Sequence, residues 1–301
     1  MRRRLLVRGS ASERVRTGVV GYHLTENRLA EVVLVRGQRS LETVKKALDP
    51  LDVQERLTDK PVLLKVNFIT TKTWETGATT DPIIVEALIQ EIREADGRVF
   101  VVESDATVTR ADRAAEATGM LDLCRRYKVQ FINLSKMKER VAVKIQGCET
   151  LGSITVPRLV LESHVVSAAK MKTHGDTTVT LGLKNMFGLL PDRFKGKYHL
   201  KGIEKVIVDI NSVLRPSLVV IDGFIAMEGY GPVNGDPVKM DLVLAGYDPV
   251  ATDATAARVM GFDPHRIYHI RRCHEKGLGE IDQIQVVGER IEEVKRCFKP
   301  A

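Results

Sequence analysis

Short runs of β-branched and aliphatic residues alternate with segments of helical periodicity along most of the chain. The runs that predict strands are 61–68, 98–104, 129–134, 163–170, 217–222 and 240–248. Strands that alternate with helices are typical of a parallel sheet covered by helices. We therefore expect an α/β protein with a mostly parallel, helix-covered sheet in Rossmann-like layers, built either as one domain or as two lobes.

Helix starts are marked by Asp-Pro pairs at 81–82, 248–249 and 263–264. Aspartate is a preferred N-cap and proline fits the first helical position, so each pair predicts a helix that follows it. Further helices are expected over Ala111–Tyr127 and Ile203–Leu214. A short strand and a helix are predicted at the C-terminal end of the sequence.

The domain boundaries follow from composition and charge. The chain has 301 residues, of which 44% are apolar and 28% charged, which excludes a disordered, collagen-like or disulfide-scaffold protein. Residues 1–24 are predicted to be a disordered basic leader. Residues 25–301 then form a single family domain, or two lobes that divide near 150–160. The irregular segment 141–157 is expected to be a β-hairpin or a pair of short edge strands.

The net charge of +7 is concentrated at the beginning of the chain. Residues 1–16 hold six arginines and one glutamate, which leaves only about +2 for the rest of the chain. Aromatic residues make up 5%, so a basic surface with stacking platforms for nucleic acid is not expected. The sequence predicts neither a signal peptide nor a membrane span. Four scattered cysteines indicate reduced thiols and a cytoplasmic location.

Polar and ionisable residues recur where the predicted strands end. Ligands of open α/β sheets bind beyond the carboxyl ends of the strands. Lys65 and Asn67 lie at the end of the first predicted strand, and Asp222 and Asp248 end two later ones. Each residue also has a simpler interpretation: Asp248 as a helix cap and Asn67 as a turn residue. We take Lys65, Asn67 and Asp248 as candidate ligand-binding residues and Asp222 as a candidate acid or base.

The segment 170–199 is the most unusual part of the sequence. Its candidate functional residues are Lys170, Lys172, His174, Lys184, Asn185 and His199. Glycines within it permit close backbone approach to a ligand, and lysines can neutralise an anion. A lysine in a partly apolar setting, such as Lys184, can have a lowered pKa and act as a base or nucleophile. The alternative interpretation is a solvated basic loop.

Two further patterns could belong to a catalytic or metal-binding site. The loop 223–237 holds Glu228, a candidate acid, and Gly229 and Gly231, candidate ligand contacts at the rim of a site. A helix with His265, His269 and Cys273 at intervals of four residues has a spacing that can bind a divalent ion. Neighbouring arginines make this helix cationic and favour an ordinary surface role. His174 with His199 is the better pair, and His199 is the candidate metal ligand.

Five segments resemble the family called domain of unknown function 362. They are "LLKVNF", "GATTDPIIVEALIQEIREADG", "AAKMKTHGDTTVTLGLKNMFG", "VIDGFIAMEGYGPVNGDP" and "DPVATDATAARVMG", and they cover about residues 31–280. The resemblance implies a cytoplasmic prokaryotic α/β protein. Many members of the family carry a ferredoxin-like module with clustered cysteines for iron–sulfur clusters. This chain has no such motif.

His174, Lys184 and His199 are also similar in spacing to residues of lactate racemase and its relatives. Those enzymes hold a nickel-pincer nucleotide, derived from nicotinic acid and tethered to a lysine. The resemblance implies that Lys184 is the tether, His174 a catalytic histidine and His199 the nickel ligand. No second catalytic histidine occurs upstream, because residues 24–163 contain none. A two-histidine racemase mechanism is therefore not expected.

These observations predict an enzyme or ligand-binding protein that acts on a small anionic substrate through the segment 170–199. The catalytic candidates are His174, Lys184, Asp222 and Glu228, and the ligand-binding candidates are Lys65, Asn67, Lys170, Lys172, Asn185, Gly229, Gly231 and Asp248. One alternative is a non-catalytic redox-partner or binding module that docks an acidic protein. The other is a nickel-pincer enzyme or an enzyme with another metal. Nucleic acid and membrane are not expected as partners.

Overall fold

A computed structural model describes residues 29–301, so the predicted leader at 1–24 lies outside the described residues. The main sheet consists of β1 (Ala30–Arg36), β2 (Val62–Lys65), β3 (Val99–Glu103), β4 (Gln130–Asn133), β7 (His164–His174), β8 (Thr178–Thr180), β9 (Leu218–Glu228), β10 (Asp236–Gly246) and β11 (Ile284–Gly288). A separate antiparallel pair is formed by β5 (Arg140–Lys144) and β6 (Ser153–Pro157), which confirms the hairpin predicted over 141–157.

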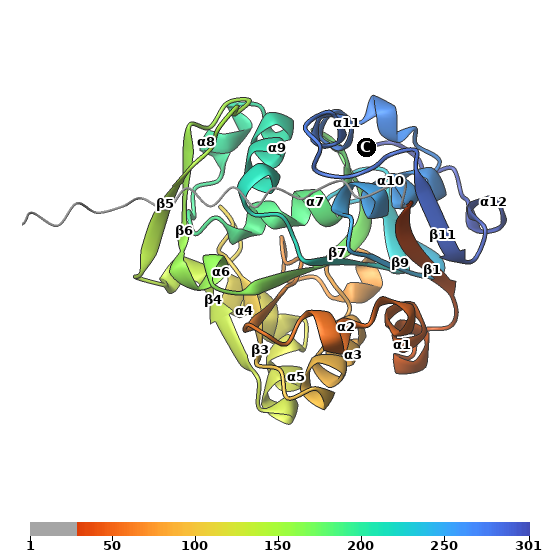
Figure 1. The fold of residues 1–301 in the computed structure, drawn as a ribbon, viewed down its shortest axis with the longest axis horizontal. Helices are drawn as coiled ribbons and strands as arrows, with labels where there is room; N and C mark the ends of the chain where they lie inside the picture. The colour runs from red at the N-terminus through yellow and green to blue at the C-terminus, as the bar shows by residue number, and fades with distance from the viewer. Residues whose placement is uncertain (1–28) are drawn as a thin grey trace, which may run out of the picture.

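Helices cover both faces of this sheet (Figure 1). The α-helices are α1 (Leu41–Leu48), α2 (Val53–Arg56), α3 (Pro82–Glu94), α4 (Ala111–Ala117), α5 (Met120–Tyr127), α6 (Arg158–Leu161), α7 (Gly182–Asn185), α8 (Gly196–His199), α9 (Ile203–Val213), α10 (Pro249–Val259), α11 (Tyr268–Glu275) and α12 (Ile291–Val294). Five 3-10 turns accompany them, η1 (Asp49–Leu51), η2 (Trp74–Thr76), η3 (Leu134–Lys136), η4 (Met186–Leu189) and η5 (Pro264–Arg266). The predicted α/β class with a mostly parallel, helix-covered sheet is confirmed.

The order of the strands creates a switch point in the middle of the sheet. The order is β11-β1-β10-β9-β7-β2-β3-β4, with β8 paired to β7. β2 pairs in parallel with β3 on one side and with β7 on the other. The chain leaves β2 toward β3 and β4 and later returns to the opposite side of β2 to form β7. In such sheets, the crevice beyond the carboxyl ends of the two diverging strands is the usual ligand site.

Local sequence signals explain most element boundaries. Asp81 and Asp248 cap α3 and α10 with their carboxylates, each followed by proline at the first helical position, as predicted. The single helix predicted over Ala111–Tyr127 is wrong, because Gly119 adopts a positive φ of 77° and divides it into α4 and α5. Asp263 caps only the short turn η5, and α11 starts separately after it.

The apolar core forms two layers, one on each face of the sheet. In β9, Val219 and Ile221 point to the layer that holds α9, α10 and α11, whereas Leu218 and Val220 point to the layer that holds α1 and α3. This alternation follows from the two-residue repeat of a strand. Strands buried on both faces read as continuous apolar runs, which is why the sequence pattern predicts them well.

A charged pair is enclosed in this core between β7 and β9. Lys170 Nζ lies 2.8 Å from Asp222 Oδ2, and both side chains have no exposed surface. The same carboxylate accepts a hydrogen bond from the Asp81 backbone N–H at 2.8 Å. Asp81 in turn receives two bonds from the Arg39 guanidinium, at 2.6 and 2.8 Å. The pair therefore ties β7 and β9 to the start of α3.

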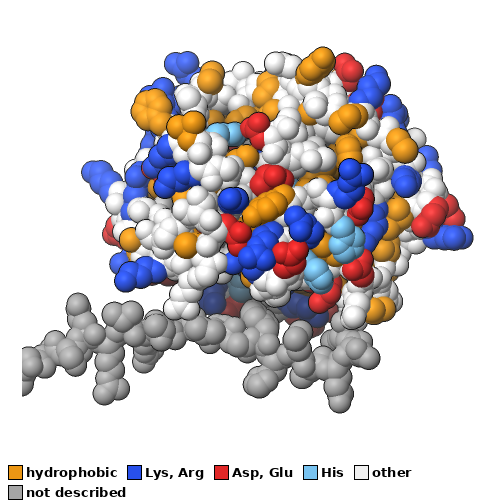
Figure 2. Space-filling view, turned by 90° about the horizontal axis from the view of Figure 1, so that it is seen from above, with side chains coloured by type: hydrophobic (Ala, Val, Ile, Leu, Met, Phe, Trp, Pro, Cys, Tyr) orange, Lys and Arg blue, Asp and Glu red, His pale blue; other side chains and the backbone are white. Residues whose placement is uncertain are grey.

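The face that carries α9, α10 and α11 has acidic and basic side chains intermingled (Figure 2). Arg272 contacts both Glu149 and Glu275, and His265 lies 2.9 Å from Asp282. Within residues 29–301, no helix is long and apolar enough to cross a bilayer.

Candidate functional site

A cavity of about 500 Å³ lies at the switch point between β2 and β7. Its walls come from the segments that follow β2, β3 and β7, from α7 and η4, and from the loop between β9 and β10. Four lysines line it: Lys65, Lys172, Lys184 and Lys195. The carboxyl ends of the strands therefore bring together amines that are far apart in the sequence.

Lys65 is the amine whose charge is balanced by a carboxylate. Its Nζ donates to Glu103 Oε2 at 2.9 Å, to Asn185 Oδ1 at 3.0 Å and to the Val66 carbonyl at 2.5 Å. Burial lowers the pKa of Lys65, and the charge of Glu103 acts in the opposite direction. Among the described residues that line the cavity, Glu103 is the one carboxylate. Its oxygens accept hydrogen bonds from Lys65 and from backbone N–H groups.

Lys172 is buried, and no carboxylate within residues 29–301 pairs with it. Its Nζ donates to Asn67 Oδ1 at 2.8 Å, to the Ala78 carbonyl at 2.6 Å and to the Pro232 carbonyl at 3.3 Å. Burial is the largest cause that lowers the pKa of Lys172 well below its ordinary value, and the charge of Lys184 adds to it. A neighbouring anion would reverse this effect, because an opposite charge favours the protonated amine.

Lys184 and Lys195 complete the group of amines. Burial lowers the pKa of Lys184 to about 8, and within residues 29–301 its amine makes no hydrogen bond or ion pair. Burial also lowers the pKa of Lys195 to about 8. The Nζ of Lys195 donates to Ser104 Oγ at 2.7 Å and lies 5.2 Å from the centre of the Phe187 ring. Both amines therefore change charge near neutral pH, which is a property of many catalytic lysines.

Two histidines lie on the other side of the cavity. His174 Nδ1 accepts a hydrogen bond from the Asp176 backbone N–H at 3.1 Å, so the proton of the neutral ring is on Nε2. Burial lowers the pKa of His174 to about 2, with a smaller effect from Lys184. The ring is a neutral donor at physiological pH. His199 is more exposed, and its Nδ1 lies 3.0 Å from Asp176 Oδ2.

Thr180 adds an unpaired hydroxyl to the cavity wall. Its Oγ1 is buried and has no hydrogen-bond partner among the described residues, although Thr180 lines the cavity. An unpaired buried hydroxyl costs about 1–3 kcal/mol relative to a paired one.

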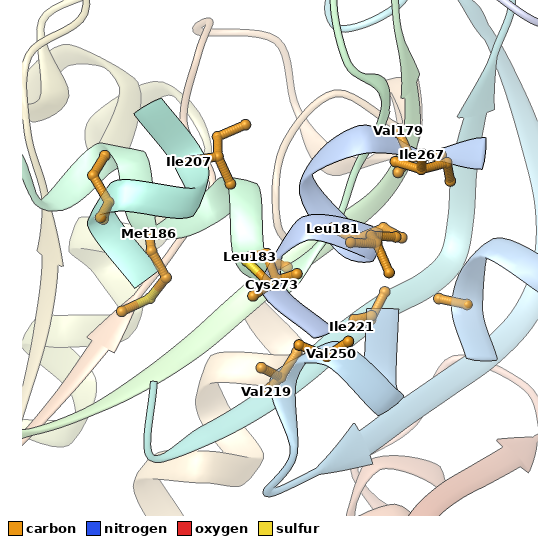
Figure 3. Close-up of a cluster of buried hydrophobic side chains, with 14 of the residues drawn as sticks. Val179, Leu181, Leu183, Met186, Ile207, Val219, Ile221, Val250, Ile267 and Cys273 are labelled. Carbon is orange, nitrogen blue, oxygen red and sulfur yellow. The ribbon is translucent and has the colours of Figure 1, made fainter. Parts of the chain in front are cut away.

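The position of Lys184 is set by the way α7 is anchored. The Asp253 carboxylate, in α10, accepts from the backbone N–H groups of Gly182 and Leu183 at 2.7 and 2.9 Å. Burial raises the pKa of Asp253 to about 7. Leu183 and Met186 pack among buried side chains of α9, α10, α11 and β9 (Figure 3). One face of α7 is therefore fixed in the core while Lys184 lines the cavity.

Seven of the residues proposed from the sequence line this cavity. They are Lys65, Asn67, Lys172, His174, Lys184, Asn185 and His199. Asn185 links several of them, since its Oδ1 accepts from both Lys65 and Asn67 and its Nδ2 donates to the Lys65 carbonyl. The other proposed residues lie elsewhere.

The remaining candidates take part in structural contacts outside the cavity lining. Lys170 and Asp222 form the buried pair between β7 and β9. Glu228 accepts from the Lys299 backbone N–H at 3.1 Å and lies 3.5 Å from Arg296. Asp248 caps α10 and also accepts from the Glu280 N–H. Gly229 adopts a positive φ of 73°, and Gly231 lies so close to the Thr173 carbonyl that a side chain would not fit.

Sequence reasoning missed Lys195, Thr180, Ser104 and Glu103 as members of the site. Lys195 stands within the segment 170–199, but only the fold places it opposite Ser104. Glu103 and Ser104 end a predicted strand, which is the signal that could have identified them.

The described residues contain no group of three or more His, Cys, Asp or Glu side chains that could hold a metal ion. His265 lies in η5, and His269 is buried in α11 with neither ring nitrogen hydrogen-bonded. The i, i+4, i+8 pattern of His265, His269 and Cys273 is thus broken, because the first residue precedes the helix.

The fold and the cavity define an α/β protein with a lysine-lined pocket at the switch point of its sheet. Residues 62–258 match the family described as "Domain of unknown function (DUF362)", and the chain belongs to this family. The chain is also 29% identical over 213 residues to the thylakoid-associated protein sll1697 of Synechocystis sp.. That alignment covers 68% of this chain and 64% of the relative.

Proposed function

We propose that the chain is an enzyme that binds a small organic anion in the lysine-lined cavity, with Lys184 as the group that exchanges a proton with the bound molecule. The observation that carries this proposal is the excess of amines. Four lysines line the cavity against one carboxylate, which is already bonded to Lys65. Buried cationic groups without partners are costly, and an anionic ligand offsets that cost.

Each residue of the site has a distinct role in this proposal. Lys172, whose three donors are taken by Asn67 and two carbonyls, attracts the anionic group of the ligand through its charge. Lys184 has a pKa of about 8 and no fixed partner among the described residues, so it can take up or release a proton near neutral pH. The Nε2–H of neutral His174 donates to an oxygen on which charge develops. A cytoplasmic location is part of the proposal, because all four cysteines are free thiols.

Calorimetric titration with pyruvate, whose carboxylate stays ionised above pH 6, tests the proposal. We expect the affinity to fall by about tenfold or more between pH 7 and pH 9.5. Lys184 and Lys195 are protonated below their pKa values of about 8 and lose their positive charge above them, so the attraction for an anion weakens as pH rises.

Lys197→Met is the matched control for this titration. Lys197 lies two residues from Lys195, is exposed and pairs with Asp192, and does not line the cavity. Its removal should leave affinity and pH dependence unchanged, whereas Lys172→Met should weaken binding at every pH. An affinity for pyruvate that changes neither with pH nor with Lys172→Met would contradict the proposal. It would then favour the alternative of a non-catalytic module that docks an acidic redox partner.

A nickel-pincer nucleotide is the second candidate, favoured by one observation. Lys184 and His199 line the same cavity, so a tether and a metal ligand would meet there. Asp176 binds His199 Nδ1, which leaves Nε2 as the nitrogen for a metal. The cofactor would supply hydride chemistry at the substrate carbon. The charge of Lys172 would still attract the substrate anion.

Elemental analysis of the chain, purified from a host able to make the cofactor, separates the two candidates. The second candidate predicts about one nickel per chain, and His199→Ala should remove it. The control is His265→Ala, because His265 lies on the surface beside Asp282 and should not affect metal content. A chain that binds pyruvate without nickel would retain the first proposal and reject the second.

A further inference from the structure

We propose that the natural ligand of the cavity is an amphipathic anion, with its charged head at the lysines and an apolar chain that extends to the mouth. This inference rests on the proposed function and specifies its substrate class. It follows from the size of the cavity, from the composition of its outer wall and from the exposed side chains around its opening.

The cavity is too large for a small anion alone. A carboxylate or phosphate head fills on the order of 60–90 Å³, at about 30 Å³ per water equivalent. The cavity measures about 500 Å³, which is the range of pockets that enclose ligands with a substantial carbon skeleton. Most of the volume therefore lies beyond the anionic head.

Apolar side chains form the wall that faces this remaining volume. Those that line the cavity are Phe68, Ile69, Val108, Phe187, Pro232 and Val233. They come from the loops that follow β2 and β3, from η4 and from the loop between β9 and β10. The amines come from β2, β7, α7 and the residue before α8. Amines and apolar side chains therefore line one cavity, and they meet at Phe187, whose ring centre lies 5.2 Å from Lys195 Nζ.

Two large apolar side chains of the cavity wall are also exposed to solvent. Val108 is 94% exposed and Ile69 is 38% exposed, and both line the cavity. Exposed apolar groups at a cavity mark a binding surface. An apolar chain that leaves the cavity would cover them.

Lysines and apolar side chains line the same cavity, and this combination favours one occupant that carries both an anionic group and an apolar chain. A protein partner or a membrane would cover the exposed residues but would leave the interior of the cavity without a ligand. One molecule with an anionic head and an apolar chain satisfies the interior and the rim together.

Calorimetric titration of the full chain with butanoate and octanoate, each below its micelle concentration, tests this inference. We expect octanoate to bind on the order of 100-fold more tightly, because each buried CH₂ increases affinity about fourfold. Butyl and octyl phosphate should show the same ratio, and the tighter of the two eight-carbon ligands identifies the head group. Val108→Ser and Ile69→Ser together should weaken octanoate binding at least about tenfold and leave butanoate binding unchanged.

Leu161→Ser is the matched control. Leu161 is 41% exposed but lies in α6, before the amino end of β7 and away from the cavity mouth. Its substitution should not change the chain-length ratio. Equal affinities for butanoate and octanoate would overturn the inference and leave the proposed function intact. Failure of all four ligands and of pyruvate to bind would reject the proposed function itself. If the rim variants altered only self-association or vesicle binding, the inference would also be overturned.

Discussion

Lys184→Met is expected to weaken pyruvate binding by about 10- to 100-fold without loss of stability. A hydrogen bond to a charged group contributes about 1.5–3 kcal/mol, which sets the size of the effect. Burial already disfavours the charged amine of Lys184, as its pKa of about 8 indicates. Methionine has a similar length and removes this cost, so the free energy of unfolding should stay the same or rise. Calorimetry gives the affinity and urea denaturation gives the stability.

A second measurement on the same variant separates a direct role of Lys184 from a general loss of charge. Reductive methylation with ¹³C adds an NMR label to accessible lysines and keeps their charge. We expect signals from Lys184 and Lys195 that titrate near pH 8, one of which is absent in Lys184→Met and has a midpoint that rises when pyruvate binds. An anion that binds equally well to Lys184→Met, or a midpoint that does not respond to pyruvate, would remove this lysine from the site.

Asp222→Ala is expected to lower the free energy of unfolding by about 3–5 kcal/mol, the usual cost of leaving one member of a buried ion pair alone. The substitution leaves the Lys170 ammonium without its partner in a place with no solvent exposure. It also removes the acceptor of the Asp81 backbone N–H at the start of α3. The change in the urea midpoint, at constant slope, measures the effect.

Two comparisons make this prediction specific. The double variant Lys170→Met/Asp222→Asn removes both charges and keeps a side-chain oxygen for the Asp81 N–H, so it should regain more than half of the lost stability. Glu162→Ala removes an exposed carboxylate that pairs with Arg158, and it should change the midpoint little. A loss below about 1 kcal/mol for Asp222→Ala would show that the buried pair does not hold β7, β9 and α3 together.

Most of the strands were predictable from the sequence because most of them are buried on both faces. β1 and β8 were not predicted, and β7 and β9 extend past the predicted ends at 170 and 222, so that Glu228 ends a strand and does not lie in the predicted loop 223–237. Continuous apolar runs such as those of β7 and β9 leave little ambiguity. Helix starts at Asp81 and Asp248 were equally clear, since cap and proline act locally. The division between α4 and α5 was missed because a single glycine in a left-handed conformation outweighed the helical pattern around it.

The candidate site was only partly predictable. The segment 170–199 supplied His174, Lys184, Asn185 and His199, because unusual residue types are adjacent there. Asp222 and Lys170 have the same chemical types and also stand at strand ends. Their side chains instead meet between two strands in the core, and no local pattern distinguishes that arrangement from a ligand site.

The sequence by itself determined the α/β class, the helix caps and the family to which the chain belongs, because these depend on neighbouring residues or on motifs in a fixed order. Only the tertiary structure decided which amines share a cavity. Lys65 and Lys172 stand on adjacent strands although 107 positions separate them in the chain, because the return to the other side of β2 places β7 beside it. Strand pairing across the switch point depends on the packing of the whole sheet, and that packing leaves three lysines facing one cavity without a carboxylate to balance them.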